Sequence, residues 1–477
     1  MISTQPARGM RDFLPDEVRR RQYVIDVVTG VYSKYGFEPL ETPAVENIET
    51  LTGKYGEEGN KLIFKILRRG EGESSGEADL ALRYDLTVPL ARVVAEYRAQ
   101  LPRVFKRYQI QPVWRADRPA RGRFREFYQC DVDVVGSRSV VVEAELCAAA
   151  SDVLLQLGFR DFQIRLNHRA VLMGVLDAAG IPGELHGAAL VALDKLDKVG
   201  AEGVRRELLE RGVSEAGARA TLAFFDHQDA HAAEAGGWNS GWLDRLRSVA
   251  GGDRPGEPHV PASADVSTRF IAAIDELAAI LSLAADTSAG PHLRIEPSLA
   301  RGLSYYTGAI MEVAVADLPG SLGGGGRYDN LIGMFLREDV PACGFSLGLE
   351  RILVVMSERK MFPPGVAGAP ADVLVTQWNA ERAGDALALA ATLRSAGLRV
   401  DVYPDADKLG KQFKYAASRG IANVLVVGDD ELAASEVTIK DMKTGDQRRV
   451  PRNDVATALS TTGSAGLPAG GSRIQNG

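Results

Sequence analysis

The sequence predicts an α+β fold, with a helical insertion in its main domain and an appended C-terminal α/β domain. Three observations support this prediction. Residues 103–136 form two alternating arms around a turn, as an antiparallel hairpin does. Residues 185–288 are charged and helical in pattern, and strand-rich sequence resumes after them. Residues 371–459 alternate between strand and helix patterns, which is typical of a compact α/β domain.

The composition excludes several classes of protein. The chain has 477 residues with 45% hydrophobic and 25% charged side chains and a net charge of -7, which indicates a globular protein. No apolar run approaches the ~20 residues that span a bilayer, and the N-terminus has no secretory apolar region, so we expect no membrane partner. The three cysteines lie far apart and the six histidines lack metal-ligand spacing. We therefore expect a cytoplasmic location and no metal site.

The N-terminal third reads as a helix, a strand pair and a second helix. A helix is expected over residues 17–35, because Val24, Val27, Val28 and Val31 share a face and Gly36 follows as a stop. Residues 61–92 predict a short strand, an acidic glycine-rich loop over 71–79, and a second strand over 80–92. Residues 138–158 predict an amphipathic helix that ends at a glycine.

The hairpin at 103–136 is strongly basic. Its second arm alternates between an apolar face (Tyr128, Cys130, Val132, Val134) and a polar face (Phe127, Gln129, Asp131, Asp133), and Pro119 and Gly122 break the loop. From Arg103 to Arg125 there are eight Lys or Arg and one acid. These residues alone leave two interpretations equal: a platform for a polyanion, or a solvated hairpin in an antiparallel sheet.

The remainder contains a glycine-rich strand region, a linker and the last domain. Residues 293–357 return to strands, and a helix beginning near Leu349 places Arg351 in its first turn. Residues 361–370 are a Pro/Gly linker, and we expect the low-complexity tail 460–477 to be disordered.

Four segments combine Arg with Asp/Glu, Tyr or Gly: LRYDLT (82–87), VWRADRPARGRFREFYQCDVD (113–133), LARGLSYYTGAIMEV (299–313) and GFSLGLERIL (344–353). No phosphate-binding P-loop and no dinucleotide fingerprint in its proper setting occurs. With YGFEPLETP and SLGGGGRYDNLIGMF, the chain resembles the histidyl-tRNA synthetases, which are class II aminoacyl-tRNA ligases, nearly from end to end. One departure is Ser304, where the family usually has an acid.

The resemblance implies a class II catalytic domain over 1–184 and 289–362, a helical insertion over 185–288 and an anticodon-binding α/β domain over 371–459. The catalytic domain would hold an antiparallel sheet of six or more strands flanked by helices. The implied function is ATP-dependent ligation of L-histidine to tRNA(His) through histidyl-adenylate, with Mg²⁺ accompanying ATP, in a homodimer.

The resemblance also implies roles for particular residues. The catalytic residues would be Arg115, Arg301 and Arg351. ATP would be bound by Arg115, Arg123, Phe127 and Arg351. Histidine would be bound by Asp85, Thr87, Gln129, Asp133, Arg301, Tyr305, Tyr306 and Tyr328, with the GGGGR loop closing the pocket. The tRNA acceptor end would meet Arg118 and Arg121. Anticodon contacts would be Gln412, Lys414 and Tyr415, for which a solvated helix face is equally expected.

This residue set suits the implied chemistry. Attack of a carboxylate on a phosphate brings two anions together, so cations are required, and guanidinium groups bind phosphate in a bidentate fashion. Two other interpretations remain. One is a catalytically silent, histidine-binding regulatory relative in histidine biosynthesis, which lacks the anticodon domain and the ATP arginines. The other is a class II synthetase for threonine or proline. Arg115, Arg351 and residues 371–458 argue against the first, and RGLSYYTG against the second.

Overall fold

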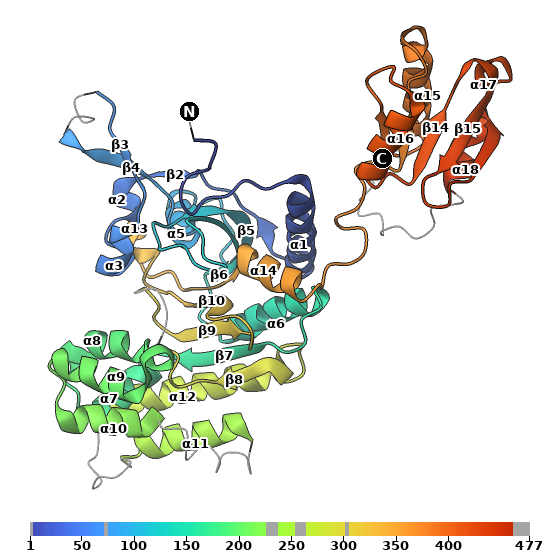
Figure 1. The fold of residues 1–477 in the computed structure, drawn as a ribbon. Helices are drawn as coiled ribbons and strands as arrows, with labels where there is room; N and C mark the ends of the chain where they lie inside the picture. The colour runs from blue at the N-terminus through green and yellow to red at the C-terminus, as the bar shows by residue number, and fades with distance from the viewer. Residues whose placement is uncertain (1–2, 71–74, 226–236, 253–263, 301–304, 461–477) are drawn as a thin grey trace. The chain divides into compact units, whose positions relative to one another are not determined.

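The computed structural model describes residues 3–70, 75–225, 237–252, 264–300 and 305–460. The chain divides into two compact units (Figure 1). The first runs up to Phe13 and from Arg21 to Met361, and the second comprises Leu14–Arg20 and the chain from Phe362 on. Each unit has a sheet of its own, so each is described separately.

The first unit is built on an eight-stranded sheet in the order β1-β5-β6-β11-β10-β9-β7-β8. Six strands from β5 to β7 pair antiparallel, and the edge strands β1 and β8 pair parallel to their neighbours. The predicted α+β class with an antiparallel sheet is therefore confirmed. The strands are β1 (Glu38–Pro39), β5 (Phe105–Trp114), β6 (Glu126–Val135), β7 (Gln163–His168), β8 (Leu293–Ile295), β9 (Ala309–Ala314), β10 (Ser321–Arg327) and β11 (Ala342–Gly348).

The basic hairpin forms the strand pair β5 and β6, as predicted. Its register sets Arg107 opposite Asp133 and Gln109 opposite Asp131. All four side chains are buried, although they lie on the polar face of the hairpin. The interpretation as a solvated hairpin is therefore wrong, because this face is enclosed within the unit.

Helices α1 (Pro15–Lys34), α6 (Val141–Gln156) and α14 (Leu349–Glu358) have the positions that the sequence predicts. Helix α1 buries Val24, Val27, Val28 and Val31. Helices α6 and α14 pack on β6 and β11, on the same side of the sheet in Figure 1. Helix α14 begins at Leu349, so the first turn of this helix carries Arg351 directly after β11.

The predicted strand over residues 80–92 is wrong beyond its first residues. Strand β4 (Ala78–Leu82) ends there, and helix α5 (Thr87–Glu96) follows. Proline is tolerated in a first helical turn, where Pro89 lies, and Asp85 accepts the backbone N–H of Val88 at 3.1 Å. Strand β4 pairs with β2 (Val45–Asn47) and β3 (Lys65–Leu67), and the short helices α2 (Ile48–Leu51) and α3 (Gly56–Lys61) lie between them in sequence. Part of the predicted 71–79 loop lies outside the described residues.

The glycine run is not a loop but the strand β10, between β9 and β11, and three of its glycines (Gly323, Gly324 and Gly325) do line a cavity on the sheet. A Cβ at Gly325 would lie 2.1 Å from the carbonyl oxygen of Gly344, and one at Gly326 would lie 2.6 Å from that of Ala309. Glycine is required here because neighbouring strands approach too closely for a side chain. The sequence predicts that the backbone is closely approached at these glycines, but it does not show that the neighbouring strands are what approach it.

We expect Gly325→Ala to lower the free energy of unfolding by about 1–3 kcal/mol, because the added methyl group overlaps backbone that cannot move aside cheaply. Chemical denaturation followed by circular dichroism measures this change. Gly30→Ala is the control, since Gly30 lies in α1 with open space at the Cβ position, and alanine there should stabilise the helix by up to about 1 kcal/mol. Equal effects of the two substitutions would contradict the steric account.

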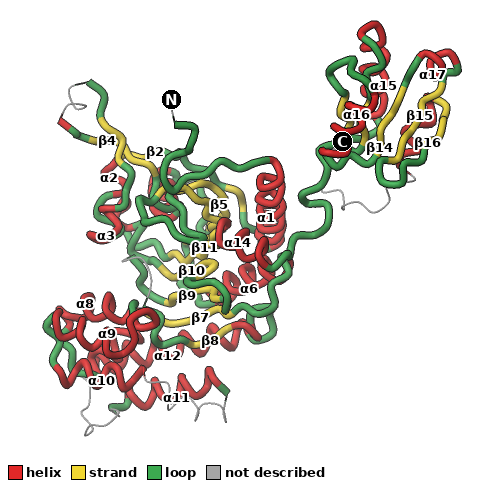
Figure 2. Tube along the Cα trace, viewed as in Figure 1, coloured by secondary structure: helices red, strands yellow, loops and turns green. Residues whose placement is uncertain are grey.

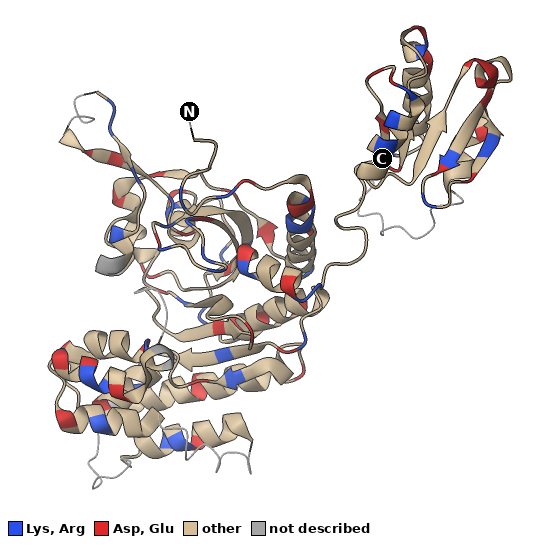
Figure 3. Cartoon of the chain, viewed as in Figure 1, with Lys and Arg blue, Asp and Glu red and all other residues tan. Residues whose placement is uncertain are grey.

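The block between β7 and β8 is helical, as its pattern predicts (Figure 2). It contains α7 (Arg169–Ala178), α8 (Gly183–Leu193), α9 (Leu196–Glu210), α10 (Glu215–Phe225), α11 (Trp238–Ala250) and α12 (Ala264–Ala284), with the 3-10 turn η2 (Gly290–His292) after it. Charges of both signs are interspersed on these helices (Figure 3). Helix α12 packs on α6, α7 and β7, which joins the block to the sheet. A short helix, α13 (Gly333–Leu336), follows β10.

The second unit has a five-stranded sheet in the order β13-β12-β14-β15-β16, parallel in its first three strands and antiparallel in the last pairs. The strands are β12 (Val373–Val375), β13 (Val400–Val402), β14 (Asn423–Val426), β15 (Glu436–Asp441) and β16 (Gln447–Pro451). The helices are η3 (Ala380–Arg382), α15 (Ala383–Ser395), α16 (Leu409–Ser418), α17 (Asp429–Ala433), η4 (Arg452–Asp454) and α18 (Val455–Ser460). The predicted α/β character is confirmed. The predicted disordered tail falls on 461–477, outside the described residues.

Among the described residues, no helix is both long enough and apolar enough to cross a membrane.

Candidate active site

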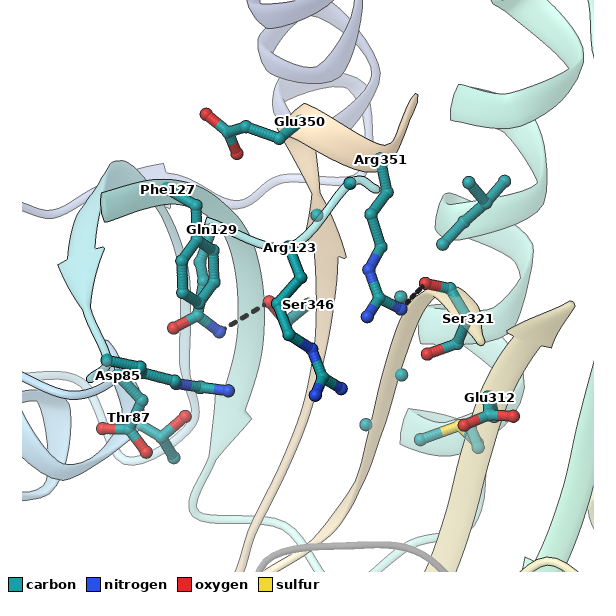
Figure 4. Close-up of a pocket in the computed structure, with 18 of the residues that line it drawn as sticks. Asp85, Thr87, Arg123, Phe127, Gln129, Glu312, Ser321, Ser346, Glu350 and Arg351 are labelled. Atoms are coloured by element: carbon teal, nitrogen blue, oxygen red, sulfur yellow. Dashed lines mark hydrogen bonds between the residues drawn. The ribbon is translucent and has the colours of Figure 1, made fainter. Parts of the chain in front are cut away.

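A cavity of about 360 Å³ opens on the large sheet, between the hairpin, β9, β10, β11 and the start of α14 (Figure 4). Nine of the predicted site residues line it: Asp85, Thr87, Arg115, Arg123, Phe127, Gln129, Tyr305, Tyr306 and Arg351. Asp133, Tyr328, Arg118 and Arg121 do not line it. Arg301 and Ser304 lie outside the described residues.

One end of the cavity is cationic. Figure 4 shows Arg123 and Arg351 directed into it, with Arg351 donating to the carbonyl oxygen of Ser321. Arg115 donates from Nε to the carbonyl oxygen of Tyr84 at 3.0 Å. The Arg115 guanidinium also lies 4.4 Å from the ring centroid of Tyr84 and 5.2 Å from that of Phe127. This combination holds Arg115 in place between two rings and suits a phosphate group beside an aromatic base.

The cavity also carries a fixed carboxylate. Asp85 is 1% exposed and accepts hydrogen bonds from the hydroxyls of Tyr55 at 3.0 Å and Tyr305 at 3.2 Å. Burial raises the pKa of Asp85, while the Val88 N–H, the Arg115 guanidinium and the two hydroxyls oppose that shift. A desolvated carboxylate with this support is a suitable partner for an ammonium group.

Gln129 supplies the neighbouring polar group. Its Nε2 donates to the hydroxyl of Ser346 at 2.9 Å, as Figure 4 shows. Its Oε1 is buried and accepts no hydrogen bond from the described part of the chain. An unmet buried acceptor in a cavity wall is costly unless a ligand supplies a donor. Tyr306 lies on the same wall, and burial raises its pKa well above its ordinary value, so its hydroxyl stays protonated.

Asp133 and Tyr328 lie together behind the cavity wall. The Tyr328 hydroxyl donates to Asp133, and the other carboxylate oxygen lies 2.8 Å from Nη2 of the buried Arg107. Because Asp133 does not line the cavity, the direct contact with an imidazole that the resemblance implies stays a prediction. The structure does place Asp133 four residues from Gln129 on the same face of β6.

The hairpin loop holds the two residues expected at the tRNA acceptor end. Both Arg118 and Arg121 are exposed. Arg121 makes an ion pair with Glu358 and donates to the carbonyl oxygen of Asp317 at 3.2 Å. Their contact with RNA stays a prediction.

The prediction of Gln412 as an anticodon contact is wrong. This side chain is 0% exposed and binds the backbone of Gln377 in both directions, at 2.9 and 2.8 Å, and the carbonyl oxygen of Asp407 at 2.7 Å. These hydrogen bonds therefore hold the start of helix α16 beside Gln377, which follows strand β12. Lys414 is exposed, and Tyr415 donates to Asp401 at 3.0 Å, so these two residues stay predictions.

Sequence reasoning missed a buried ion pair at the cavity edge. Nη1 of Arg21 in α1 lies 2.8 Å from Oε1 of Glu350, and the other carboxylate oxygen accepts the Tyr128 backbone N–H at 2.9 Å. Burial raises the pKa of Glu350, and Arg21 opposes this shift. Glu350 directly precedes Arg351, so this pair fixes the start of α14 against β6. The helical spacing of Arg21 with Val24, Val28 and Val31 was the available signal, because it places a cation on a buried face.

We expect Arg21→Gln to lower the free energy of unfolding by about 3–5 kcal/mol, because it leaves the Glu350 carboxylate buried without a cation. A denaturation curve measures this loss. Arg247→Gln is the matched control: Arg247 pairs with Asp275 on the surface at 3.3 Å, where both side chains are about half exposed, and the change should be under about 1 kcal/mol. Similar losses in both variants would refute the assigned role of the buried pair.

The described residues contain no cluster of His, Cys, Asp or Glu that could hold a metal ion. An antiparallel sheet whose cavity combines several arginines with a buried carboxylate, in a chain with an appended α/β domain, defines a class II aminoacyl-tRNA synthetase. The comparisons with known proteins specify the family. Residues 9–352 match the model of the histidyl-tRNA synthetase family, and residues 372–462 match that of the anticodon binding domain. The chain belongs to the histidyl-tRNA synthetase family.

Individual relatives agree with this assignment. The chain is 40% identical to the histidine–tRNA ligase of Christiangramia forsetii and 41% identical to that of Porphyromonas gingivalis, each match covering 95% of this chain and 98% of the relative. The crystal structure of the histidyl-tRNA synthetase from Nostoc sp. PCC 7120 is 30% identical, with a TM-score of 0.76 over 97% of this chain and 100% of that one. A Bacillus halodurans structure described as an ATP phosphoribosyltransferase regulatory subunit/histidyl-tRNA synthetase is 20% identical and shares the fold.

Proposed function

We propose that this protein ligates L-histidine to tRNA(His) with ATP, through a histidyl-adenylate formed in the cavity. The observation that carries the proposal is that one cavity brings together three arginines, Arg115, Arg123 and Arg351, and the buried carboxylate of Asp85. The family match and the two ligases at about 40% identity support the same activity.

In the first step the histidine carboxylate attacks the α-phosphate of ATP, and pyrophosphate leaves. Arg115 would lie between these two anions, reduce their repulsion and stabilise charge as it develops. Phe127 would stack on adenine, with Arg351 over the opposite face of the base and Arg123 at the β- and γ-phosphates. Arg301, outside the described residues, would be the additional cation at the α-phosphate.

The amino-acid end would select histidine by its polar groups. Asp85 and Thr87 would bind the α-ammonium group together with Oε1 of Gln129. Tyr306, kept protonated by burial, would bind one imidazole nitrogen, with Asp133 at the other. Tyr305 would fix Asp85, to which it already donates, and Tyr328 would fix Asp133. A buried site of this kind rejects amino acids that leave its polar groups unpaired.

Mg²⁺ would enter with ATP rather than belong to the protein. Glu312 of β9, which lines the cavity (Figure 4), offers the hard oxygen ligand that suits this ion. When bound, Mg²⁺ neutralises charge on the phosphate oxygens of ATP.

In the second step a hydroxyl of the 3′-terminal ribose of the tRNA attacks the carbonyl carbon of the histidyl-adenylate, an ester bond forms and AMP leaves. Arg118 and Arg121 on the exposed loop would meet the acceptor end, and the second unit, with Lys414 and Tyr415, would bind the anticodon. The protein would act as a homodimer in the cytoplasm.

Charging assays with labelled amino acids and transcripts of several tRNAs test this function. The expected result is ATP-dependent attachment of histidine to tRNA(His) and of no other amino acid. The alternative is a regulatory relative, a type of protein that lacks the ATP arginines, whereas this chain has Arg115 and Arg351. Histidine binding without any charging would support this alternative and overturn the proposal.

A further inference from the structure

Asp131 is a buried carboxylate behind the amino-acid end of the cavity, to which no role in the reaction has been given. It is 2% exposed and shares a face of β6 with Gln129 and Asp133. The sheet register sets Gln109 of β5 on one side of it and Ser346 of β11 on the other. Asp131 is therefore enclosed between the strands that form the cavity wall.

The carboxylates here outnumber the cations that contact them. Nη2 of Arg107 lies 2.8 Å from Oδ2 of Asp133 and 4.0 Å from Oδ2 of Asp131, so one guanidinium serves two carboxylates. Burial raises the pKa of Asp131 to about 7; Arg107 opposes this shift and Asp133 adds to it. Burial raises the pKa of Asp133 as well. Burial and the repulsion by Asp133 therefore favour the protonated form of Asp131, the carboxylate that lies farther from Arg107.

One further cation, Arg83, faces the pair, but its guanidinium donates elsewhere, to the carbonyl oxygens of Pro112 at 2.8 Å and of Thr42 at 2.6 Å. Groups that face this pair are Tyr32 of α1, Arg83 and Asp85 after β4, Tyr306 before β9, Tyr328 after β10 and Cys343 of β11. Burial raises the pKa of each of the three tyrosines and of the thiol, so all four stay neutral. Asp85 adds a further negative charge, which a cationic ligand in the cavity would offset.

Asp131 also sets the orientation of Gln129. Oδ1 of Asp131 lies 3.4 Å from Nε2 of Gln129, which donates to Ser346 at 2.9 Å, and the Ser346 hydroxyl bonds to Asp131. These acceptors hold the amide nitrogen on the side of β11. The amide oxygen, which has no partner among the described residues, is thereby left for a donor in the cavity.

We propose that Asp131 is a positioning residue for the amino-acid substrate: it turns the Gln129 amide oxygen toward the substrate ammonium group and loses a proton when that cation binds. The proposal rests on the proposed function, in which histidine occupies this end of the cavity. The protonated carboxyl group of Asp131 becomes a carboxylate, and the proton passes to the solvent. The ammonium charge compensates the carboxylate that forms.

Calorimetric titration of L-histidine into the full-length protein, in two buffers of different ionisation enthalpy, counts protons released per site. We expect the wild type to release about half a proton more than Asp131→Asn at about pH 6.5, and the difference to vanish at about pH 8.5. Free histidine has an imidazole pKa of about 6.5, and its contribution is common to both proteins, so it cancels in the difference. Asp131→Asn should also raise the KM for histidine several-fold, with little change in the KM for ATP.

The control variant is Asp275→Asn. Asp275 is an exposed residue of α12 that pairs with Arg247, and this variant should release as many protons as the wild type. Equal proton release by wild type and Asp131→Asn would overturn the inference while leaving the proposed function intact. If the wild type binds no histidine, the proposed function itself fails.

A second measurement on the wild type alone covers the case in which Asp131→Asn does not fold. The ligand is 3-(imidazol-4-yl)propionic acid, which lacks the ammonium group. We expect it to bind without the extra proton release, and release equal to that of histidine would overturn the inference.

Discussion

Replacing Arg115 with alanine should lower the rate of histidyl-adenylate formation by about a thousandfold, because it removes the cation held between the two reacting anions. The structure motivates this expectation. Arg115 lines the cavity beside Phe127, and its Nε is anchored on the carbonyl oxygen of Tyr84 at 3.0 Å. Single-turnover quench-flow with labelled ATP measures the chemical step separately from substrate binding.

Arg115→Lys should restore little of this rate, since an ammonium group cannot both bond to Tyr84 and present a planar fork to phosphate. Arg98→Ala, which removes an exposed cation 3.8 Å from Glu338, should retain the wild-type rate. A fall of less than about tenfold in Arg115→Ala would show that the cation acts in binding rather than in the chemical step.

Replacing Asp85 with asparagine should raise the KM for histidine by about a hundredfold and leave the KM for ATP within a few-fold of wild type. The carboxylate is 1% exposed, so no water can replace its charge opposite the substrate ammonium. Tyr55, Tyr305 and Val88 also donate to it, and the asparagine amide offers them one acceptor oxygen instead of two. Steady-state ATP–pyrophosphate exchange at varied histidine and varied ATP separates the two constants.

Asp275→Asn serves again as the exposed control and should change neither constant. An equal rise in both constants for Asp85→Asn would indicate general damage to the cavity, and an unchanged KM for histidine would remove Asp85 from the amino-acid site.

Local periodicity was sufficient for much of the fold. The valine stripe of α1 and the alternating arms of β5 and β6 each follow from patterns a few residues long. Many residues of the site could be predicted from the sequence because its cationic and aromatic residues are clustered in short segments. Nine of the predicted residues indeed meet in one cavity, although they come from segments up to 266 residues apart, from Asp85 to Arg351.

The features that could not be predicted depend on contacts between distant segments. The sequence pattern predicts a strand where helix α5 lies, because the apolar run there carries β-branched residues. Tertiary packing of Val88, Leu90 and Val94 in a common core favours the helix. The glycines of β10 were expected in a loop, since only the two neighbouring strands show why side chains are excluded. The sequence around Gln412 is typical of a solvent-exposed helix face. In the structure, however, its side-chain amide makes hydrogen bonds to the backbone of Gln377, 35 residues away in sequence.

The most direct test of the central claim is exchange of labelled pyrophosphate into ATP by the full-length protein, with each amino acid in turn and without tRNA. The cavity described here predicts rapid exchange with L-histidine and at least about a hundredfold less with every other amino acid. Absence of histidine-dependent exchange, or equal exchange with threonine or proline, would contradict it.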